Sequence, residues 1–450
     1  GFYQIDPAVG VIGADELALG FRLVADGSGR DVRPLIRLGI VAEDPAAAFA
    51  ALAKIGPVTA PNRFYQTPHA TGFGWQRPQS GAALRGVKAE GGWGVVCTEY
   101  CSIHPSSDDS PYAFLTMWDD DDIAPLAATA DAIHAHGSLA GIELWHGGFH
   151  ASNRMTRVPG IGPQVQPAMY HLPTTARAMD KADIRAFRGW QRDAAKRAKQ
   201  AGFDIVYVYA GHDYLPFQFL SRRTNTRGDE YGGPLENRAR LLREMLEDTR
   251  EAVGDTCAVA IRLAVDELHG PNGICADDEG RDVVAMLAEL PDLWDVNVAG
   301  ALGNDSKSAR FSPEGYQEDY IRFVKTLTSK PVVSVGRFTS PDRMVEQIKK
   351  GVQDFIGAAR PSIADNRSAI VIRSCVESAA IDFRSSDIRR PGSAAFRCRR
   401  WPKAGRRGLD SGSSDMGKTL TTGTPDMGRK RRGYNPATGS APSLRDRHSE

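Results

Sequence analysis

Residues 206–240 read VYVYAGHDYLPFQFLSRRTNTRGDEYGGPLENRAR, a stretch that opens as an apolar run and closes as a charged segment. The β-branched and aromatic residues at its start predict a buried strand, and the apolar spacing at its end predicts an amphipathic helix. A buried strand followed by a helix is the repeating unit of a parallel sheet. Tyr209 and His212 stand at the junction, just where the strand is expected to end.

The same alternation recurs along the chain. The expected strands are Arg63–Gln66, Gly94–Glu99, Leu139–Leu144, Phe203–Val208, Cys257–Leu263, Leu293–Val298, Pro331–Gly336 and Asp354–Ala358. Amphipathic stretches such as ADIRAFRGWQRDAAKRAKQAG and ENRARLLREMLEDTREAVG separate them, and several begin at Asp, Glu or Pro and end at Gly, as helices do. About eight parallel strands alternating with helices predict a TIM (β/α)8 barrel, with a doubly wound open sheet as the alternative.

Composition sets wider bounds. The 450 residues are 41% hydrophobic and carry a formal net charge of +1, which gives no bias toward nucleic acid or anionic membranes. The sequence contains no apolar run of about 18 residues, and its six cysteines are scattered as reduced thiols would be, so we expect a cytoplasmic protein with no membrane span. Three parts are expected: residues 1–53 without assigned structure, the barrel at 54–365, and an irregular, disordered Arg/Ser/Gly-rich tail at 366–450.

In a barrel of this kind the active site lies where the strands end. Polar residues at or just past the expected strand ends are His69, Tyr100, Glu143, Tyr209, His212, Arg262 and Asp305. Arg262 is the only charge in its strand, so it is either a cationic partner for an anionic cofactor or half of a structural ion pair. Gly336 and Arg337 follow the seventh strand, and Ala359 and Arg360 follow the eighth, where this fold commonly binds phosphate.

Several segments together resemble the old yellow enzyme family of FMN barrels. They are KIGPVTAPNRFYQTPHATG, VKAEGGWGVVCTEYCSIHP, LAGIELWHGG, AGFDIVYVYAGHDYLPFQFL, DEYGGPLENRAR, PVVSVGRF and IGAARPSIAD. Within the family they are most similar to the trimethylamine and dimethylamine dehydrogenases and to N-methylproline demethylases of the stachydrine pathway. The resemblance covers about residues 54–365, in the order that a barrel requires.

The resemblance implies a role for each candidate. The residues expected to contact FMN are Pro68, His69, Glu143, Arg262, Gly336, Arg337, Ala359 and Arg360. Tyr100 is expected in the substrate wall, and Trp145 and His146 are either substrate-facing or core. Ene-reductases of the family usually carry His where this chain has Tyr209 and Gln where it has Glu143, so the amine branch is favoured, and an NAD(P)H-dependent ene-reductase is the alternative.

The implied reaction oxidises the N-methyl C–N bond of a secondary or tertiary amine, of the N-methylproline or di/trimethylamine type. Hydride passes from the methyl carbon to the flavin, and hydrolysis of the iminium releases formaldehyde. The resemblance assigns catalysis to Tyr209, His212 and Asp305, with His212 polarising or deprotonating the phenol so that the neutral amine is favoured. The expected partners are a small amine and an electron acceptor, an electron-transfer flavoprotein in relatives, with no nucleic acid and no membrane; a homodimer is compatible.

The chain also departs from the family pattern. Ala70 stands where the trimethylamine enzymes have a cysteine bonded to the flavin, so FMN is expected to be noncovalent. After Asp365 only Cys375 and Cys398 remain, which are too few and too far apart for the [4Fe-4S] motif of the family, so no cluster and no other metal are expected. The abrupt change at the tail is typical of a frameshift or truncation, which leaves a catalytically silent FMN-binding barrel as a further alternative.

Overall fold

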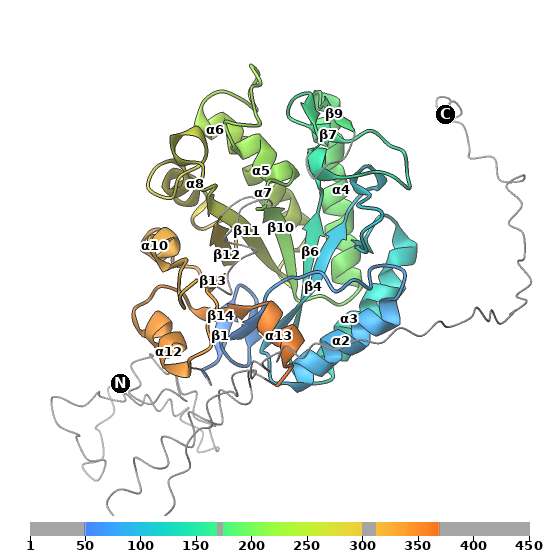
Figure 1. Ribbon diagram of the computed structural model, residues 1–450. Coiled ribbons are helices and arrows are strands. Elements are labelled where there is room, and N and C mark those ends of the chain that lie inside the picture. The colour runs from blue at the N-terminus through green and yellow to red at the C-terminus, as the bar shows by residue number, and fades with distance from the viewer. Residues whose placement is uncertain (1–48, 50, 169–173, 299–311, 368, 370–450) are drawn as a thin grey trace, which may run out of the picture. The chain divides into compact units, whose positions relative to one another are not determined.

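The computed structural model describes residues 49, 51–168, 174–298, 312–367 and 369 (Figure 1). Asp305, the two tail cysteines Cys375 and Cys398, and most of the expected terminal segments therefore lie outside the described residues. The predicted domain boundaries stay predictions.

Eight parallel strands form a closed barrel at the centre of the described part (Figure 1). They are β3 (Phe64–Gln66), β4 (Val95–Ser102), β6 (Leu139–Trp145), β10 (Ile205–Ala210), β11 (Ala258–Asp266), β12 (Leu293–Val298), β13 (Val332–Val335) and β14 (Phe355–Ala358). The barrel closes because β3 pairs with β14 on one side and with β4 on the other. The predicted TIM barrel is thus confirmed, and an open sheet, which would leave two unpaired edges, is excluded.

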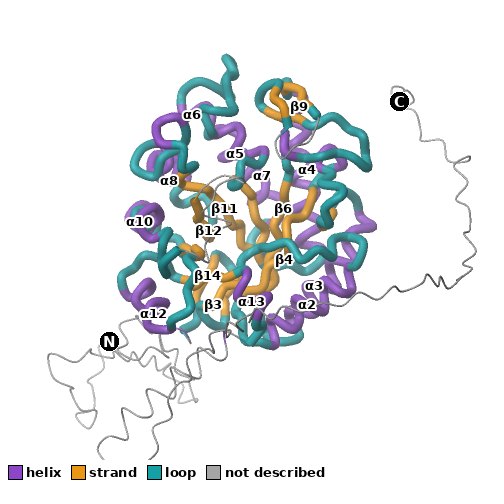
Figure 2. Tube along the Cα trace, in the orientation of Figure 1, coloured by secondary structure: helices purple, strands orange, loops and turns teal. Residues whose placement is uncertain are grey.

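Helices surround the strands on the outside (Figure 2). They are α2 (Pro78–Glu90), α3 (Ile123–His134), α4 (Lys181–Gln200), α5 (Leu215–Leu220), α6 (Leu235–Arg238), α7 (Arg240–Val253), α8 (Glu279–Leu287), α10 (Glu318–Ile321), α11 (Val324–Leu327), α12 (Pro341–Lys349) and α13 (Arg360–Ala364). Short 3-10 turns occur at Pro105–Ser107, Asp120–Asp122, Gly148–His150 and Gly270–Asn272. No helix among the described residues has both the length and the apolarity needed to cross a membrane.

Helix α4 illustrates how the sequence produces this outer layer. Asp180 caps its N-terminus by accepting from the backbone of Asp183, and Asp183 reciprocates, which forms a capping box. Its apolar face buries Ile184 and Phe187 completely, and each such burial contributes about 1.5–3 kcal/mol to stability. Charged residues cover the opposite face, so only one orientation of the helix against the barrel removes the apolar surface from water.

The barrel interior is packed rather than hollow. Its side chains form an apolar cluster that includes Tyr65, Cys97 and Tyr207, and the two phenol oxygens lie 2.5 Å apart. An antiparallel hairpin of β1 (Ala53–Ile55) and β2 (Val58–Ala60) contributes Ala53, Ile55 and Ala60 to the same cluster. Because the interior is filled, a ligand must bind at the open carboxyl ends of the strands.

Four strands extend further than the sequence pattern predicted. β4 continues to Ser102, β6 to Trp145, β10 to Ala210 and β11 to Asp266. Tyr100 and Tyr209 therefore lie inside strands and not just past them. Hydrogen bonding between parallel neighbours extends these strands: on β10, for example, Tyr209 is still paired with Arg262 of β11. The predicted boundaries were wrong because hydrogen bonding between neighbouring strands, which a single segment does not reveal, decides where each strand ends.

In the described part of the chain, four further short strands lie outside the eight-stranded barrel. They are β5 (Leu115–Thr116), which extends the sheet beside β4, and the three-stranded sheet of β7 (Ile161–Gly162), β8 (Gln166–Pro167) and β9 (Thr175–Ala178).

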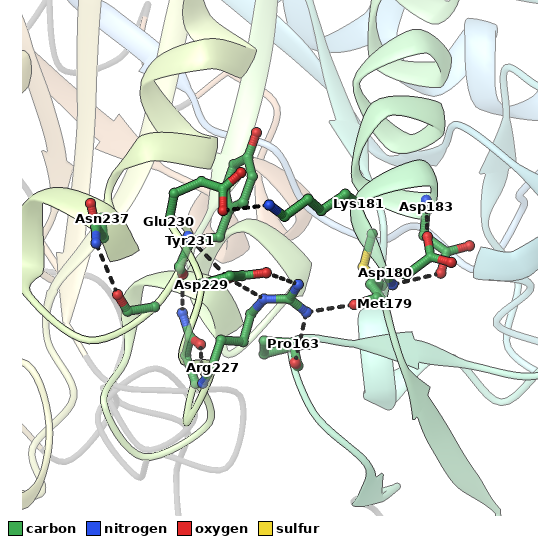
Figure 3. Close-up of polar contacts among 12 residues, drawn as sticks. Pro163, Met179, Asp180, Lys181, Asp183, Arg227, Asp229, Glu230, Tyr231 and Asn237 are labelled. Carbon is green, nitrogen blue, oxygen red and sulfur yellow. Dashed lines mark hydrogen bonds and ion pairs between the residues drawn. The ribbon is translucent and has the colours of Figure 1, made fainter.

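The motif DEYGGPLENR has a structural role (Figure 3). Arg227 pairs with Asp229, and its Nη1 also donates to the carbonyls of Pro163 and Met179, which flank the small sheet. Lys181, at the start of α4, pairs with Glu230 at 2.8 Å. The loop after β10 is therefore fastened to the segment after β6, which holds two walls of the barrel mouth together.

Candidate active site

A buried guanidinium lies at the centre of the candidate site. Nη1 of Arg262, on β11, is 2.8 Å from Oε1 of Glu143 on β6, and it also donates to the carbonyl of Pro68 at 3.4 Å. Nε of Arg262 lies 3.8 Å from Oδ2 of Asp295 on β12. The structure therefore brings Pro68, Glu143 and Arg262 together, and the ion pair that the sequence left open for Arg262 is present, with Glu143 as its partner.

Burial changes the ionisation of this cluster. Burial raises the pKa of Glu143 to about 7 even though Arg262 opposes the shift, and it raises the pKa of Asp295 to about 6 in the same way. Burial lowers the pKa of Arg262, but the two carboxylates outweigh it and the net pKa lies above the ordinary value. Arg262 is thus a permanent cation, whereas Glu143 can take up or release a proton near neutral pH.

The phenol and the imidazole of the opening stretch contact each other. Tyr209 Oη lies 2.6 Å from Nδ1 of His212. His212 and Asp213 have φ values of +52° and +59°. Residues other than glycine rarely adopt this backbone conformation, and those that do are often found at functional sites. Burial raises the pKa of Tyr209 well above its ordinary value, although Arg262 lies over the ring at 5.3 Å and opposes this. The phenol therefore keeps its proton, and its hydroxyl group shares a hydrogen bond with Nδ1 of His212.

Four aromatic rings line the site in an unbroken chain, which we call the aromatic wall. Tyr100 on β4 lies 4.8 Å from Trp145 at the end of β6, measured between ring centroids, and Trp145 lies 5.2 Å from Tyr214. Tyr214 lies 5.1 Å from Tyr209. All three contacts are T-shaped, so that the edge of one ring meets the face of the next.

The wall includes one residue that the sequence analysis missed. Tyr214 follows His212 by two residues, in the loop after the fourth barrel strand, and its position there was the available signal. Trp145 is 2% exposed and belongs to the wall. His146 instead faces the core, because its Nε2 lies 2.9 Å from Ser106 Oγ and its ring stacks on Trp190.

The residues expected to hold phosphate lie at the ends of neighbouring strands. β13 and β14 are paired in parallel through Val335 and Gly357, so the segments that follow them leave the barrel side by side. Gly336 and Arg337 follow β13, and Arg337 has a φ of +58° and donates to the carbonyl of Ser312 at 2.6 Å. Ala359 and Arg360 follow β14 at the start of α13, and the side chain of Arg360 is exposed.

His69 lies beside two buried basic side chains of α2, Arg85 and Lys88. Nε2 of His69 lies 3.1 Å from Nη1 of Arg85 and is also in contact with Nζ of Lys88. Burial, with help from these basic side chains, lowers the pKa of His69 to about 2, and burial together with Arg85 lowers the pKa of Lys88 to about 6. His69 is therefore a neutral ring whose backbone carbonyl is held by Arg85 at 2.8 Å.

Polar atoms at the barrel mouth are buried without a protein partner among the described residues. They include Oγ1 of Thr67, next to Pro68, and both amide atoms of Asn297 at the end of β12. A buried polar group without a partner costs about 1–3 kcal/mol. Such atoms are expected where a polar ligand completes the hydrogen bonding.

The comparison with protein families decides the class. The model of the NADH:flavin oxidoreductase / NADH oxidase family matches residues 50–375. The chain belongs to this family. The match spans all eight barrel strands, so the flavin oxidoreductase family, which includes old yellow enzyme, accounts for the whole described barrel.

Relatives within the flavin oxidoreductase family include amine-acting proteins. Dimethylamine dehydrogenase of Hyphomicrobium sp. is 43% identical over 320 residues, which cover 69% of this chain and 44% of the relative. The structure of 6-hydroxypseudooxynicotine amine oxidase from Pseudomonas geniculata N1 matches with a TM-score of 0.72 and 49% identity, over 75% of this chain and 50% of that one. Histamine dehydrogenase from Rhizobium sp. 4-9 matches with a TM-score of 0.70 and 45% identity, over 75% and 49%. The chain spans about half the length of these relatives.

Proposed function

We propose that this protein is an FMN-dependent amine oxidoreductase that removes N-methyl groups from a secondary or tertiary amine. The observation that carries the proposal is the hydrogen bond between Tyr209 and His212 at one end of the aromatic wall. The wall suits a cationic amine, and the Tyr209–His212 pair suits removal of its proton. The similarity to dimethylamine dehydrogenase supports the same substrate class.

The described residues fit an FMN. The unpartnered atoms of Thr67 and Asn297 offer hydrogen bonds to a ring system, and Arg262 offers it a permanent cation. Gly336, Arg337, Ala359 and Arg360 would hold the phosphate. When bound, the flavin would supply the hydride acceptor for oxidation of the N-methyl carbon. Ala70 offers no sulfur for a covalent link, so the cofactor would be noncovalent.

The Tyr209–His212 pair would move one proton. An alkylammonium ion cannot readily lose hydride from the carbon beside its positive nitrogen, so the substrate must first become a neutral amine. The ammonium N–H would donate to Tyr209 Oη as the phenol passes its own proton to Nδ1 of His212, which becomes an imidazolium. The phenol ends protonated with the proton that the ammonium gave up, the original phenol proton is on His212, and the amine lone pair is freed. Asp305 would orient His212 in this step.

The remaining chemistry would follow from the neutral amine. Loss of hydride from the N-methyl carbon would leave an iminium ion, and water would convert it to formaldehyde and the demethylated amine. N-methylproline, dimethylamine and trimethylamine are the candidate substrates. The electron acceptor is a separate partner, and the cytoplasm is the compartment that the free thiols of Cys97, Cys101, Cys257 and Cys275 support.

The visible spectrum of the purified protein, followed by anaerobic titration with the three amines, tests the proposal. We expect an acid-extractable flavin that one of the amines bleaches, with formaldehyde formed in equal amount. A bound flavin that no amine bleaches but that NADPH reduces, with an enone as acceptor, would overturn the proposal in favour of an ene-reductase. A protein without flavin would also overturn it.

A further inference from the structure

Two adjacent carboxylates at the barrel mouth have different surroundings. Asp108 accepts hydrogen bonds from the backbone N–H groups of Met155 and Thr156, at 2.7 and 2.8 Å, and so fastens two loops together. Oδ2 of Asp109 instead accepts from the phenol of Tyr100 at 2.8 Å. In the described part of the chain no Lys, Arg or His forms an ion pair with Asp109. When it is ionised, Asp109 therefore offers Tyr100 a negative charge that no cation in the described part of the chain pairs with.

Tyr100 carries this charge into the aromatic wall. Its ring lies 4.8 Å from Trp145, and its hydroxyl group donates to Asp109. A phenol that donates to a carboxylate gains electron density on its ring, and the electrostatic attraction of a cation to the ring increases with that density. The carboxylate itself adds attraction that is screened little, because Asp109 is partly buried.

We propose that Asp109 is a specificity-determining residue, which through Tyr100 makes the aromatic wall select the cationic, alkylammonium form of its ligand over a neutral molecule of the same shape. The identity of the ligand class rests on the proposed function, but the selection by charge can be measured without turnover. Capture of the cation by the wall and its later deprotonation at Tyr209 would then be separate steps at opposite ends of one row of rings.

The surroundings of Asp109 make the selection depend on pH. Burial raises the pKa of Asp109 to about 7, the hydrogen bond from Tyr100 opposes this, and the charge of Asp108 adds to it. The other titratable groups that face the Tyr100–Asp109 pair are Glu99 on β4 and Tyr214 across the wall. A bound permanent cation favours the ionised carboxylate, so affinity for the cation is expected to rise between about pH 6 and pH 8.

Tetramethylammonium is the probe for this test, because it is a permanent cation with no proton to lose. Calorimetry on the FMN-loaded full-length protein would give its dissociation constant, with tert-butanol as a neutral probe of similar shape. We expect Asp109→Asn to weaken tetramethylammonium binding about tenfold, to leave tert-butanol unchanged and to abolish the rise with pH. Asp121→Asn, an exposed residue of the turn Asp120–Asp122, is the matched control that should bind as the wild type does.

Tyr100→Phe keeps the ring and removes the hydroxyl group, so it breaks the same link while the Asp109 side chain stays in place. In the Tyr100→Phe background, Asp109→Asn should weaken tetramethylammonium binding by less than about threefold, because the carboxylate no longer acts on the ring through the hydroxyl group. Near-ultraviolet circular dichroism checks that each variant is folded. If Asp109→Asn fails to fold, Tyr100→Phe decides the inference, because tetramethylammonium affinity in that variant should no longer rise with pH.

Three results would overturn the inference: no binding of tetramethylammonium to the wild type, an Asp109→Asn effect below about twofold, or an equal loss for tert-butanol. These results are distinct from a failure of the proposed function. If tetramethylammonium binds in the Asp109-dependent way but no amine bleaches the flavin, the selection stands and the proposed reaction fails. If an amine bleaches the flavin but the Asp109→Asn effect is absent, the reaction stands and the inference fails.

Discussion

Glu143 and Arg262 form an ion pair of 2.8 Å across two barrel strands, with both side chains buried. Glu143 is on β6 and Arg262 on β11, with β10 between them, and Arg262 lies over the ring of Tyr209 on β10. The pair thus connects the expected flavin site to the residues expected to handle the proton. Removing one partner leaves the other as an uncompensated buried charge.

The first prediction concerns that pair. Glu143→Ala should lower the free energy of unfolding by about 3–5 kcal/mol, because Arg262 would remain buried with fewer partners, and should abolish flavin retention. Glu143→Gln keeps an oxygen acceptor at the same place and should retain the flavin with a loss below about 2 kcal/mol. Urea denaturation and the flavin-to-protein absorbance ratio measure both effects. If Glu143→Ala and Glu143→Gln lose the same amount of stability and of flavin, the Glu143–Arg262 ion pair is not what holds this site together.

The second prediction concerns the Tyr209–His212 hydrogen bond. Tyr209→Phe removes the hydroxyl group that passes the proton, so amine-dependent bleaching at about pH 7 should slow roughly 100-fold. The rate should recover as the pH rises toward the pKa of the amine in solution, because more of the substrate is then already neutral. Anaerobic stopped-flow absorbance at several pH values measures this. Tyr231→Phe, whose hydroxyl donates to Glu244 in another part of the fold, is the control. An unchanged rate at every pH would remove Tyr209 from the mechanism.

The third prediction concerns Lys88, which is fully buried and lies 3.2 Å from Ser362 Oγ. Burial and Arg85 lower its pKa from 10.5 to about 6, so between these values the unfolded chain binds the extra proton and the folded chain does not. Stability should therefore rise with pH across this range, by up to about 1.4 kcal/mol per pH unit.

Lys88→Met should remove that rise. Urea denaturation at about pH 7 and about pH 9 gives the two free energies for each protein. Lys349→Met, which alters an exposed lysine of α12, should keep the wild-type pH dependence. If Lys88→Met keeps it as well, Lys88 is protonated in the folded protein and the sign of the argument is wrong.

The fourth prediction concerns the contacts of Arg227 shown in Figure 3. Arg227→Lys cannot pair with Asp229 through two nitrogens and also reach the carbonyls of Pro163 and Met179, so stability should fall by about 2 kcal/mol. The flavin spectrum should stay unchanged, because none of these groups lies in the candidate site. Arg322→Lys is the control, because Arg322 forms an exposed ion pair with Asp319. It should change the free energy of unfolding by less than about 0.5 kcal/mol.

Much of the fold could be predicted from short stretches. Each barrel strand is recognisable because it is buried on both faces and therefore apolar throughout, and α4 is recognisable because only one of its faces is buried. The ends of strands were harder to predict. Tyr100 and Tyr209 are polar enough to suggest a loop, yet they remain in strands because their neighbours on β6 and β11 continue the pairing.

The candidate site divides in the same way. The residue types and their place after each strand indicated Glu143, Tyr209, His212 and Arg262, since a closed barrel must bring strand ends together. Tyr214 was missed although its place after the fourth strand was a signal, and Asp109 could not be found in this way. Their roles depend on which ring meets which and on which of two adjacent carboxylates turns toward Tyr100.

The sequence by itself determined the alternation of strands and helices, and hence the barrel and the end of it at which chemistry occurs. These features follow from apolar periodicity, which is local. Only the tertiary structure decided that Arg262 pairs with Glu143, that Tyr209 is hydrogen-bonded to His212 and that Asp109 accepts a hydrogen bond from Tyr100. The physical reason is that hydrogen bonds, ion pairs and shifted pKa values depend on distances of a few ångströms between residues far apart in the chain, and those distances exist only once the barrel has closed.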